Sequence, residues 1–194
     1  MSSEAYVDAN PVVRECYERL GCLLEEGDDA FVGRGPALLQ AAIRDPAFFD
    51  GVATDPAPPG SYTRRRVVGD PGRHVVRFME WPPGFSLLPH EHHGRPCFEV
   101  LVEGLLAVVD MRADPVSDGL YELTPLGTTV ARPGDAAVVD PRVNGVHAVY
   151  SPVRSRSLHV YPSDEAHAYG YCLVEDGSDR YSRERFDLRR EPRE

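Results

Sequence analysis

The chain has no long apolar run, little cysteine and a shortage of positive charge. No stretch approaches the roughly 20 apolar residues of a membrane-spanning helix, so we expect no membrane association. The first residues, MSSEAYVDANP, lack the basic and apolar regions of a secretion signal, and we therefore expect a cytoplasmic protein. The formal net charge of −10 argues against a nucleic acid as partner.

Cysteine is not only scarce but scattered. The four cysteines stand at positions 16, 22, 97 and 172, without the CxxC spacing that would indicate a zinc site. We interpret three of them as ordinary reduced thiols. Cys97 differs, because it follows a cluster of histidines.

The composition fits one compact domain. A length of 194 residues is ample for a single core and short for two. Hydrophobic residues make up 42% of the chain, and 18 prolines indicate a globular protein with many turns.

The first quarter of the chain predicts two helices. Asn10 and Pro11 form a helix start signal, and apolar residues then recur on one helical face until Gly27. A second helix is expected from Pro36 to about Arg44. We expect both helices to pack outside a sheet.

From Tyr62 onward, short β-type runs alternate with Gly/Pro turns. Many short strands without intervening helices are typical of a barrel or a sandwich. We expect a single domain with a helical segment at 1–55, a barrel at 60–175 and a solvated tail at 176–194. The runs are YTRRRVV, RHVVRFMEW, FSLLPHEHH, CFEVLVEG, LLAVVDMR, GLYELTPLG, TTVARPGD, AAVVDP, GVHAVYS and RSLHVYP.

The histidines indicate a metal site. Side chains alternate along a strand, so His90 and His92 project from one face and can grip one ion. His147, in a distant strand, is the candidate for a third ligand. Imidazole suits iron, zinc, copper and nickel alike, so the ligands alone do not identify the metal.

The surroundings of this pair resemble the first sequence motif of the cupin barrels. Gly84 precedes His90 by six residues, and Gly104 closes a following hairpin. In most cupins a glutamate five residues after the second histidine joins the metal shell. Here that slot holds Cys97, while Glu99 comes two positions late.

This departure resembles the animal-type cysteine dioxygenases, cupins in which a cysteine replaces that glutamate. The matching segments appear in the family's order: AAIRDPAFF, YTRRRV, EWPPG, HEHHGRPCFEVLVEGLL, GVH and SLHVY. The resemblance implies an all-β cupin fold, a double-stranded β-helix barrel or jelly roll, with a small N-terminal helical segment. It implies a dioxygenase that uses iron(II) and dioxygen to oxidise L-cysteine, or a close cysteine-like thiol, to the sulfinic acid.

The resemblance also implies roles for individual residues. His90, His92 and His147 would be the metal ligands. Arg64 would clamp the substrate carboxylate, and Tyr62, Met79 and Trp81 match positions that border the pocket. Tyr161, oriented by His159 and in turn by Ser157, would place its hydroxyl near the substrate, and Cys97 would be joined to Tyr161 by a thioether bond.

The residues alone leave plainer alternatives open. Arg64 belongs to an RRR run, which is usually solvated charge. Ser157, His159 and Tyr161 could form an ordinary polar strand face. Cys97 could be a small buried hydrophobe.

Two other functions stay open as well. The same fold could serve a specialised cysteine-oxidising enzyme of natural-product biosynthesis, with nickel(II) in place of iron(II), a sulfonate or sulfonamide product, and with or without decarboxylation. A non-catalytic cupin sensor with a structural zinc is the alternative of another class. The expected partners are a small thiol and dioxygen, and the expected state is a monomer or a weak oligomer.

Overall fold

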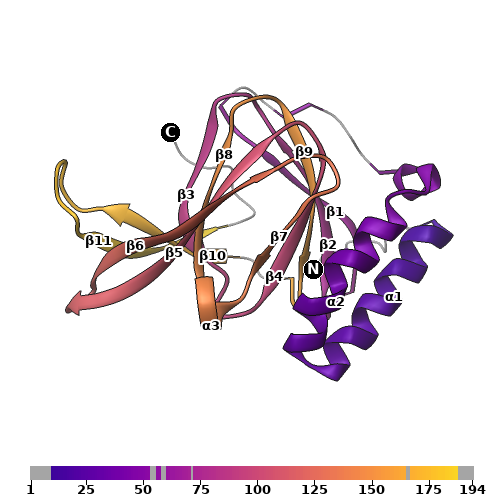
Figure 1. The fold of residues 1–194 in the computed structure, drawn as a ribbon, viewed down its shortest axis with the longest axis horizontal. Coiled ribbons are helices and arrows are strands. Elements are labelled where there is room, and N and C mark those ends of the chain that lie inside the picture. The colour runs from indigo at the N-terminus through magenta and orange to yellow at the C-terminus, as the bar shows by residue number, and fades with distance from the viewer. Residues whose placement is uncertain (1–9, 53–55, 58–59, 71, 165–166, 188–194) are drawn as a thin grey trace, which may run out of the picture.

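The computed structural model describes residues 10–52, 56–57, 60–70, 72–164 and 167–187. Two N-terminal helices pack side by side against one side of a β-barrel, and the long hairpins at the left of the view extend away from them (Figure 1). Within the described part of the chain, no helix combines the length and the apolar character needed to cross a membrane.

The strands form two antiparallel sheets. One sheet has the order β1-β2-β9-β4-β7, and the other closes on itself in the order β10-β11-β6-β5-β8-β3. The all-β barrel with a small N-terminal helical segment that is predicted from the sequence is confirmed. The bounds are β1 (Thr63–Gly69), β2 (Val75–Trp81), β3 (Phe85–Glu91), β4 (Cys97–Glu103), β5 (Leu106–Ser117), β6 (Leu120–Ala131), β7 (Ala136–Val139), β8 (Val146–Ser151), β9 (Ser155–Tyr161), β10 (His167–Leu173) and β11 (Tyr181–Asp187).

The open sheet separates two environments. Alternate residues of its strands pack with α1 (Pro11–Glu26) and α2 (Asp28–Ala42) in one apolar core, which includes Phe98, Val100, Leu158 and Val160. The residues between them face the other way, into the barrel. This alternation turns Cys97 and Glu99 of β4, and Ser157, His159 and Tyr161 of β9, toward the interior.

The first helix lies where the sequence predicts it, capped by Asn10, whose side chain accepts from the backbone N–H of Val13. The second helix does not: α2 begins at Asp28 and contains Pro36 in its interior, so the predicted start at Pro36 is wrong. Acidic residues in the first turn suit the helix N-terminus. Tertiary packing of Phe31 and Gly35 against the barrel outweighs the hydrogen bond that the proline forfeits. A short 3₁₀ helix (Pro46–Phe49) follows α2, and a four-residue helix, α3 (Pro141–Asn144), precedes β8.

The C-terminal region also departs from expectation. Tyr181–Asp187, predicted to lie in a solvated tail, instead forms β11 and pairs with β10 and β6. The strand could not be recognised in the sequence, because its charged side chains have partners that lie far away along the chain. Arg183 pairs with Glu91 and lies over the ring of Tyr169. Likewise, the two runs predicted at 119–127 and 128–135 are one strand, β6, with a register shift that accommodates Pro125.

Gly104 closes the β4–β5 hairpin under a tight steric limit. Its φ is +90°, and a Cβ there would lie 2.4 Å from the carbonyl oxygen of Arg154. Gly119, at φ +72°, has no atom within 4 Å of the same position. The two glycines share the left-handed backbone but differ in available space.

We therefore expect Gly104→Ala to destabilise the protein more than Gly119→Ala. The left-handed strain costs about 1–2 kcal/mol at either position, and the collision with backbone should add about 2 kcal/mol at position 104 alone. Denaturant unfolding of both variants measures the difference. Equal losses of stability would contradict the close approach at Gly104.

Candidate metal centre and active site

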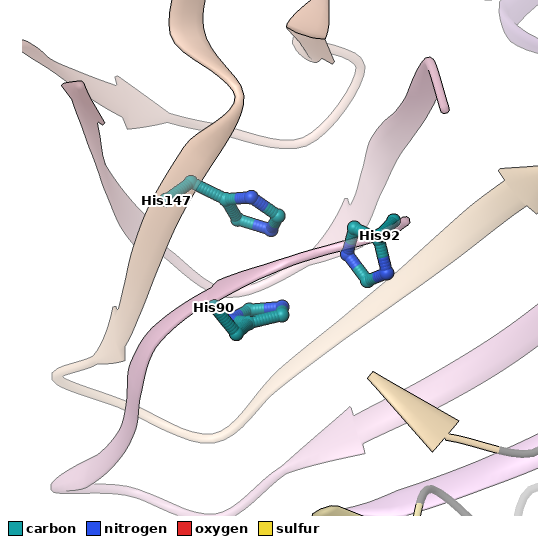
Figure 2. Close-up of side chains that lie close together, drawn as sticks. All are labelled: His90, His92 and His147. Atoms are coloured by element: carbon teal, nitrogen blue, oxygen red, sulfur yellow. The ribbon is translucent and has the colours of Figure 1, made fainter. Parts of the chain in front are cut away.

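Three histidine side chains converge inside the barrel. His90 lies on β3, His92 follows the end of that strand, and His147 lies on β8, where it pairs in register with His90. Their ligand atoms all lie within 4.8 Å of one another. Figure 2 shows the three rings gathered around one space, two from the β3 segment and one from β8. The group could hold one metal ion.

The protonation of these rings suits a metal cation. All three are buried, at 4%, 9% and 5% exposure. Burial lowers the pKa of His90 to about 4, and burial with mutual repulsion holds the pKa values of His92 and His147 well below the usual range. The rings are therefore neutral at pH 7, with lone pairs free to bind a metal.

The hydrogen bonds around the rings also fit an ion. His90 Nδ1 lies 2.9 Å from the carbonyl oxygen of Leu88, so it donates there and its lone pair lies on Nε2. His147 Nδ1 is buried and has no hydrogen-bond partner within the described residues. A bound cation is a partner that such an unpaired buried nitrogen could take. The donor set does not select one metal.

A chain of hydrogen bonds runs beside the histidine group. Trp81 Nε1 donates to Ser157 Oγ at 2.8 Å, and Ser157 Oγ lies 2.8 Å from His159 Nε2. Since Ser157 accepts from the indole, its own hydroxyl can donate to His159, which places the His159 proton on Nδ1. That nitrogen lies 3.4 Å from Tyr161 Oη.

Arg64 is half-buried and lies against Tyr161. Its guanidinium carbon lies 4.9 Å from the centroid of the Tyr161 ring. Its positive charge helps to depress the pKa values of His92 and His159, the latter to about 3 after the larger effect of burial. Tyr62 stacks on Trp81 with ring centroids 5.1 Å apart, and Met79 belongs to the same buried cluster.

Cys97 and Tyr161 lie together in a small cluster with Val75 and Val139. Both are buried, at 5% and 7% exposure. Burial raises the pKa of the Cys97 thiol and of the Tyr161 phenol, so both are protonated at neutral pH. Cys97 forms no disulfide.

The cavity beside the three histidines brings together only part of the predicted site. Arg64 does not line it and lies over the Tyr161 ring instead, and Tyr62, Met79 and Trp81 pack together in a separate buried cluster. His90, Ser157 and Tyr161 are also not among the lining residues. The lining residues are His92, Cys97, Phe98, Glu99, Val108, Ala137, Val139, His147 and His159.

No role is predicted for Glu99 from the sequence, yet this residue lines the cavity. Its carboxylate is buried, and Oε2 lies 3.2 Å from His159 Nδ1. Burial and the charge of Asp110 raise its pKa to about 7. Strand alternation could have indicated this position from the sequence, because it puts Glu99 on the same face of the strand as Cys97.

Two further histidines of this region stand apart from the metal group. His93 has a positive φ of 55°, and its Nε2 lies 2.9 Å from the carbonyl oxygen of His167. The His167 ring in turn lies near Arg185. These contacts join the end of β3 to the β10–β11 hairpin.

Comparison with known proteins finds cupin structures of low similarity. No family model matches the chain, and no curated protein matches it. A cupin superfamily protein from Desulfitobacterium hafniense aligns at 12% identity, over 58% of this chain and 84% of that one, with a TM-score of 0.41. The polyketide cyclase RemF from Streptomyces resistomycificus aligns at 21% identity, over 64% and 80%, with a TM-score of 0.44. An oxalate oxidase in complex with glycolate aligns at 14% identity, over 58% and 56%, with a TM-score of 0.41.

Replacing one histidine of the group should abolish stoichiometric metal binding. We expect His147→Ala to weaken metal affinity by about 100-fold or more, because even a residue that only orients a ligand is worth about 10- to 100-fold. Metal analysis after dialysis against a weak chelator measures this. His93→Ala, outside the group, is the control and should retain the metal of the unaltered protein.

The metal-free protein should lose stability in acid. Burial lowers the pKa of His90 to about 4 in the folded protein, below the value of about 6.5 of an exposed histidine, so the unfolded chain takes up the proton first as the pH falls. Stability is complete above pH 6.5 and falls toward pH 4, by about 3 kcal/mol from this residue. Denaturant unfolding across this range should show a shallower loss for His90→Gln. An identical slope in the variant would contradict the buried neutral imidazole.

Proposed function

We propose that this chain is a metal-dependent thiol dioxygenase that oxidises L-cysteine, or a close cysteine-like thiol, to its sulfinic acid. One observation carries the proposal: three buried imidazoles gather beside Tyr161, and the guanidinium of Arg64 lies over the ring of that tyrosine. The metal group found among the described residues contains no carboxylate. Three histidine ligands would leave coordination positions on the ion free for a substrate and for dioxygen.

His90, His92 and His147 would hold the ion. When bound, iron(II) would supply the one-electron chemistry that lets dioxygen react with a thiol, and nickel(II) is the alternative metal. The overall reaction is balanced, since one thiol and one dioxygen molecule give one sulfinic acid. Val108, Ala137 and Val139 are apolar lining residues, and they would keep bulk water from a reacting sulfur bound there.

Arg64 is the proposed carboxylate clamp. Its planar guanidinium can hold a carboxylate through two parallel hydrogen bonds, and its position over Tyr161 puts that clamp beside the phenol. Tyr62, Met79 and Trp81 would form the wall behind it. The phenol of Tyr161 would then donate to the bound substrate, since the proton on His159 Nδ1 leaves the tyrosine hydrogen free to point away from His159.

Cys97 and Tyr161 are the proposed partners of a thioether bond. Their packing in one cluster supports this. The bond would join Cys97 Sγ to a ring carbon of Tyr161, and the two protons and two electrons released would pass to dioxygen. A mass 2 Da below that of the unmodified chain, lost in Cys97→Ser, would mark the bond.

The expected partners are the thiol and dioxygen alone. We also propose the cytoplasm as the compartment, because the four cysteines are all free and a reducing environment keeps them so. A monomer or weak oligomer remains the expected state.

The product identifies the reaction. Incubation of the iron-loaded protein with L-cysteine and ¹⁸O-labelled dioxygen should give a product with two labelled oxygens and an intact carboxyl group. A decarboxylated or more highly oxidised product would favour the specialised biosynthetic enzyme. Stoichiometric zinc with no oxygen uptake would favour the sensor.

Arg64→Gln should raise the KM for L-cysteine by about 10- to 100-fold, the usual loss for a charge-assisted hydrogen bond. Arg65→Gln is the matched control, because the neighbouring side chain projects from the opposite face of β1. Oxygen-electrode kinetics measure both. Equal KM values for the two variants would exclude Arg64 as the clamp.

A further inference from the structure

Glu99 is an acidic residue inside the barrel, and the proposed function assigns it no role. On β4 it pairs in register with His159 of β9 and with Ala137 of β7. Its exposure is 7%, and it lines the cavity shared by His92 and His147. A carboxylate in such a place loses much of its hydration, so it needs partners within the fold or from a ligand.

One oxygen of this carboxylate is held by the protein. The chain of bonds from Trp81 through Ser157 to His159 Nε2 leaves the imidazole proton on Nδ1, which lies 3.2 Å from Glu99 Oε2. This distance is shorter than the 3.4 Å from the same nitrogen to Tyr161 Oη. Glu99 is therefore the nearer acceptor of that proton, and its side chain is held in place.

The other oxygen has no partner. Glu99 Oε1 is buried and accepts no hydrogen bond from any residue that the structure describes. The charge that acts most on Glu99 is that of Asp110, another carboxylate, and Asp110 is itself bonded to the Asn144 side-chain amide at 2.8 Å. The cavity wall here offers a free carboxylate oxygen, and a cationic donor placed against it would favour the ionised form of Glu99.

We propose that Glu99 Oε1 accepts a hydrogen bond from the amino group of an amino thiol bound in the cavity. This inference rests on the proposed function, which supplies the thiol as substrate class, and it adds that the site selects thiols that carry an amino group. Arg64, which lies over the Tyr161 ring outside the cavity lining, would hold the carboxylate of an amino acid, and Glu99 would hold its amine. A thiol that lacks the amine would leave Oε1 unpaired and would bind more weakly.

Binding measured without turnover tests this. Iron-loaded protein under argon is titrated by calorimetry with L-cysteine and with 3-mercaptopropionate, which lacks the amine. Glu99→Gln should weaken L-cysteine binding by about 10- to 100-fold and change that of 3-mercaptopropionate by less than about threefold. Glu103→Gln, an exposed position at the end of the same strand, is the control and should alter neither.

Three outcomes would overturn the inference. Equal weakening of both thiols would show that Glu99 acts only through the position of His159. No change for either thiol would show that the amine lies elsewhere. Loss of iron in Glu99→Gln would make the residue part of the metal centre. Oxygen uptake by the unaltered protein with L-cysteine tests the proposed function separately, because selective binding could be present without oxidation and oxidation without this selectivity.

Discussion

The structure depends on how polar side chains are held inside a closed barrel away from water. Imidazoles, carboxylates and hydroxyls lose hydration there, and each must find a partner or change its protonation. The three histidines meet this constraint by remaining neutral and gathering around one space. Neutral lone pairs that point at a common centre are the arrangement that a metal ion needs, so burial itself prepares the site.

The two sheets contribute different parts of the site. Helices α1 and α2 cover the outer face of the open sheet, and their apolar core fixes β4 and β9 side by side. On the inner face, this pairing sets Glu99 against His159 and brings Cys97 and Tyr161 into one cluster. The closed sheet contributes the metal group through the neighbouring strands β3 and β8. The site therefore requires both sheets.

Much of this could be predicted from the sequence, because it follows from strand alternation. The HxH spacing and the shared face of Ser157, His159 and Tyr161 need only a period of two. Tertiary contacts decided the rest. Gly35 packs closely on Phe98, and α2 begins well before Pro36. The strand β11 is formed by charged residues whose partners lie far along the chain. Glu99 shares the strand face of Cys97, but which of its two oxygens finds a partner depends on neighbours that are distant in the sequence.

The central claim is that one metal ion is bound by His90, His92 and His147 alone. X-ray absorption at the iron edge, on protein loaded with one equivalent of iron(II) under argon, tests it most directly. The account predicts the multiple-scattering pattern of three imidazoles, with the other positions occupied by light atoms from solvent. A sulfur neighbour from Cys97, a pattern that fits fewer than three imidazoles, or iron that is not retained would contradict it.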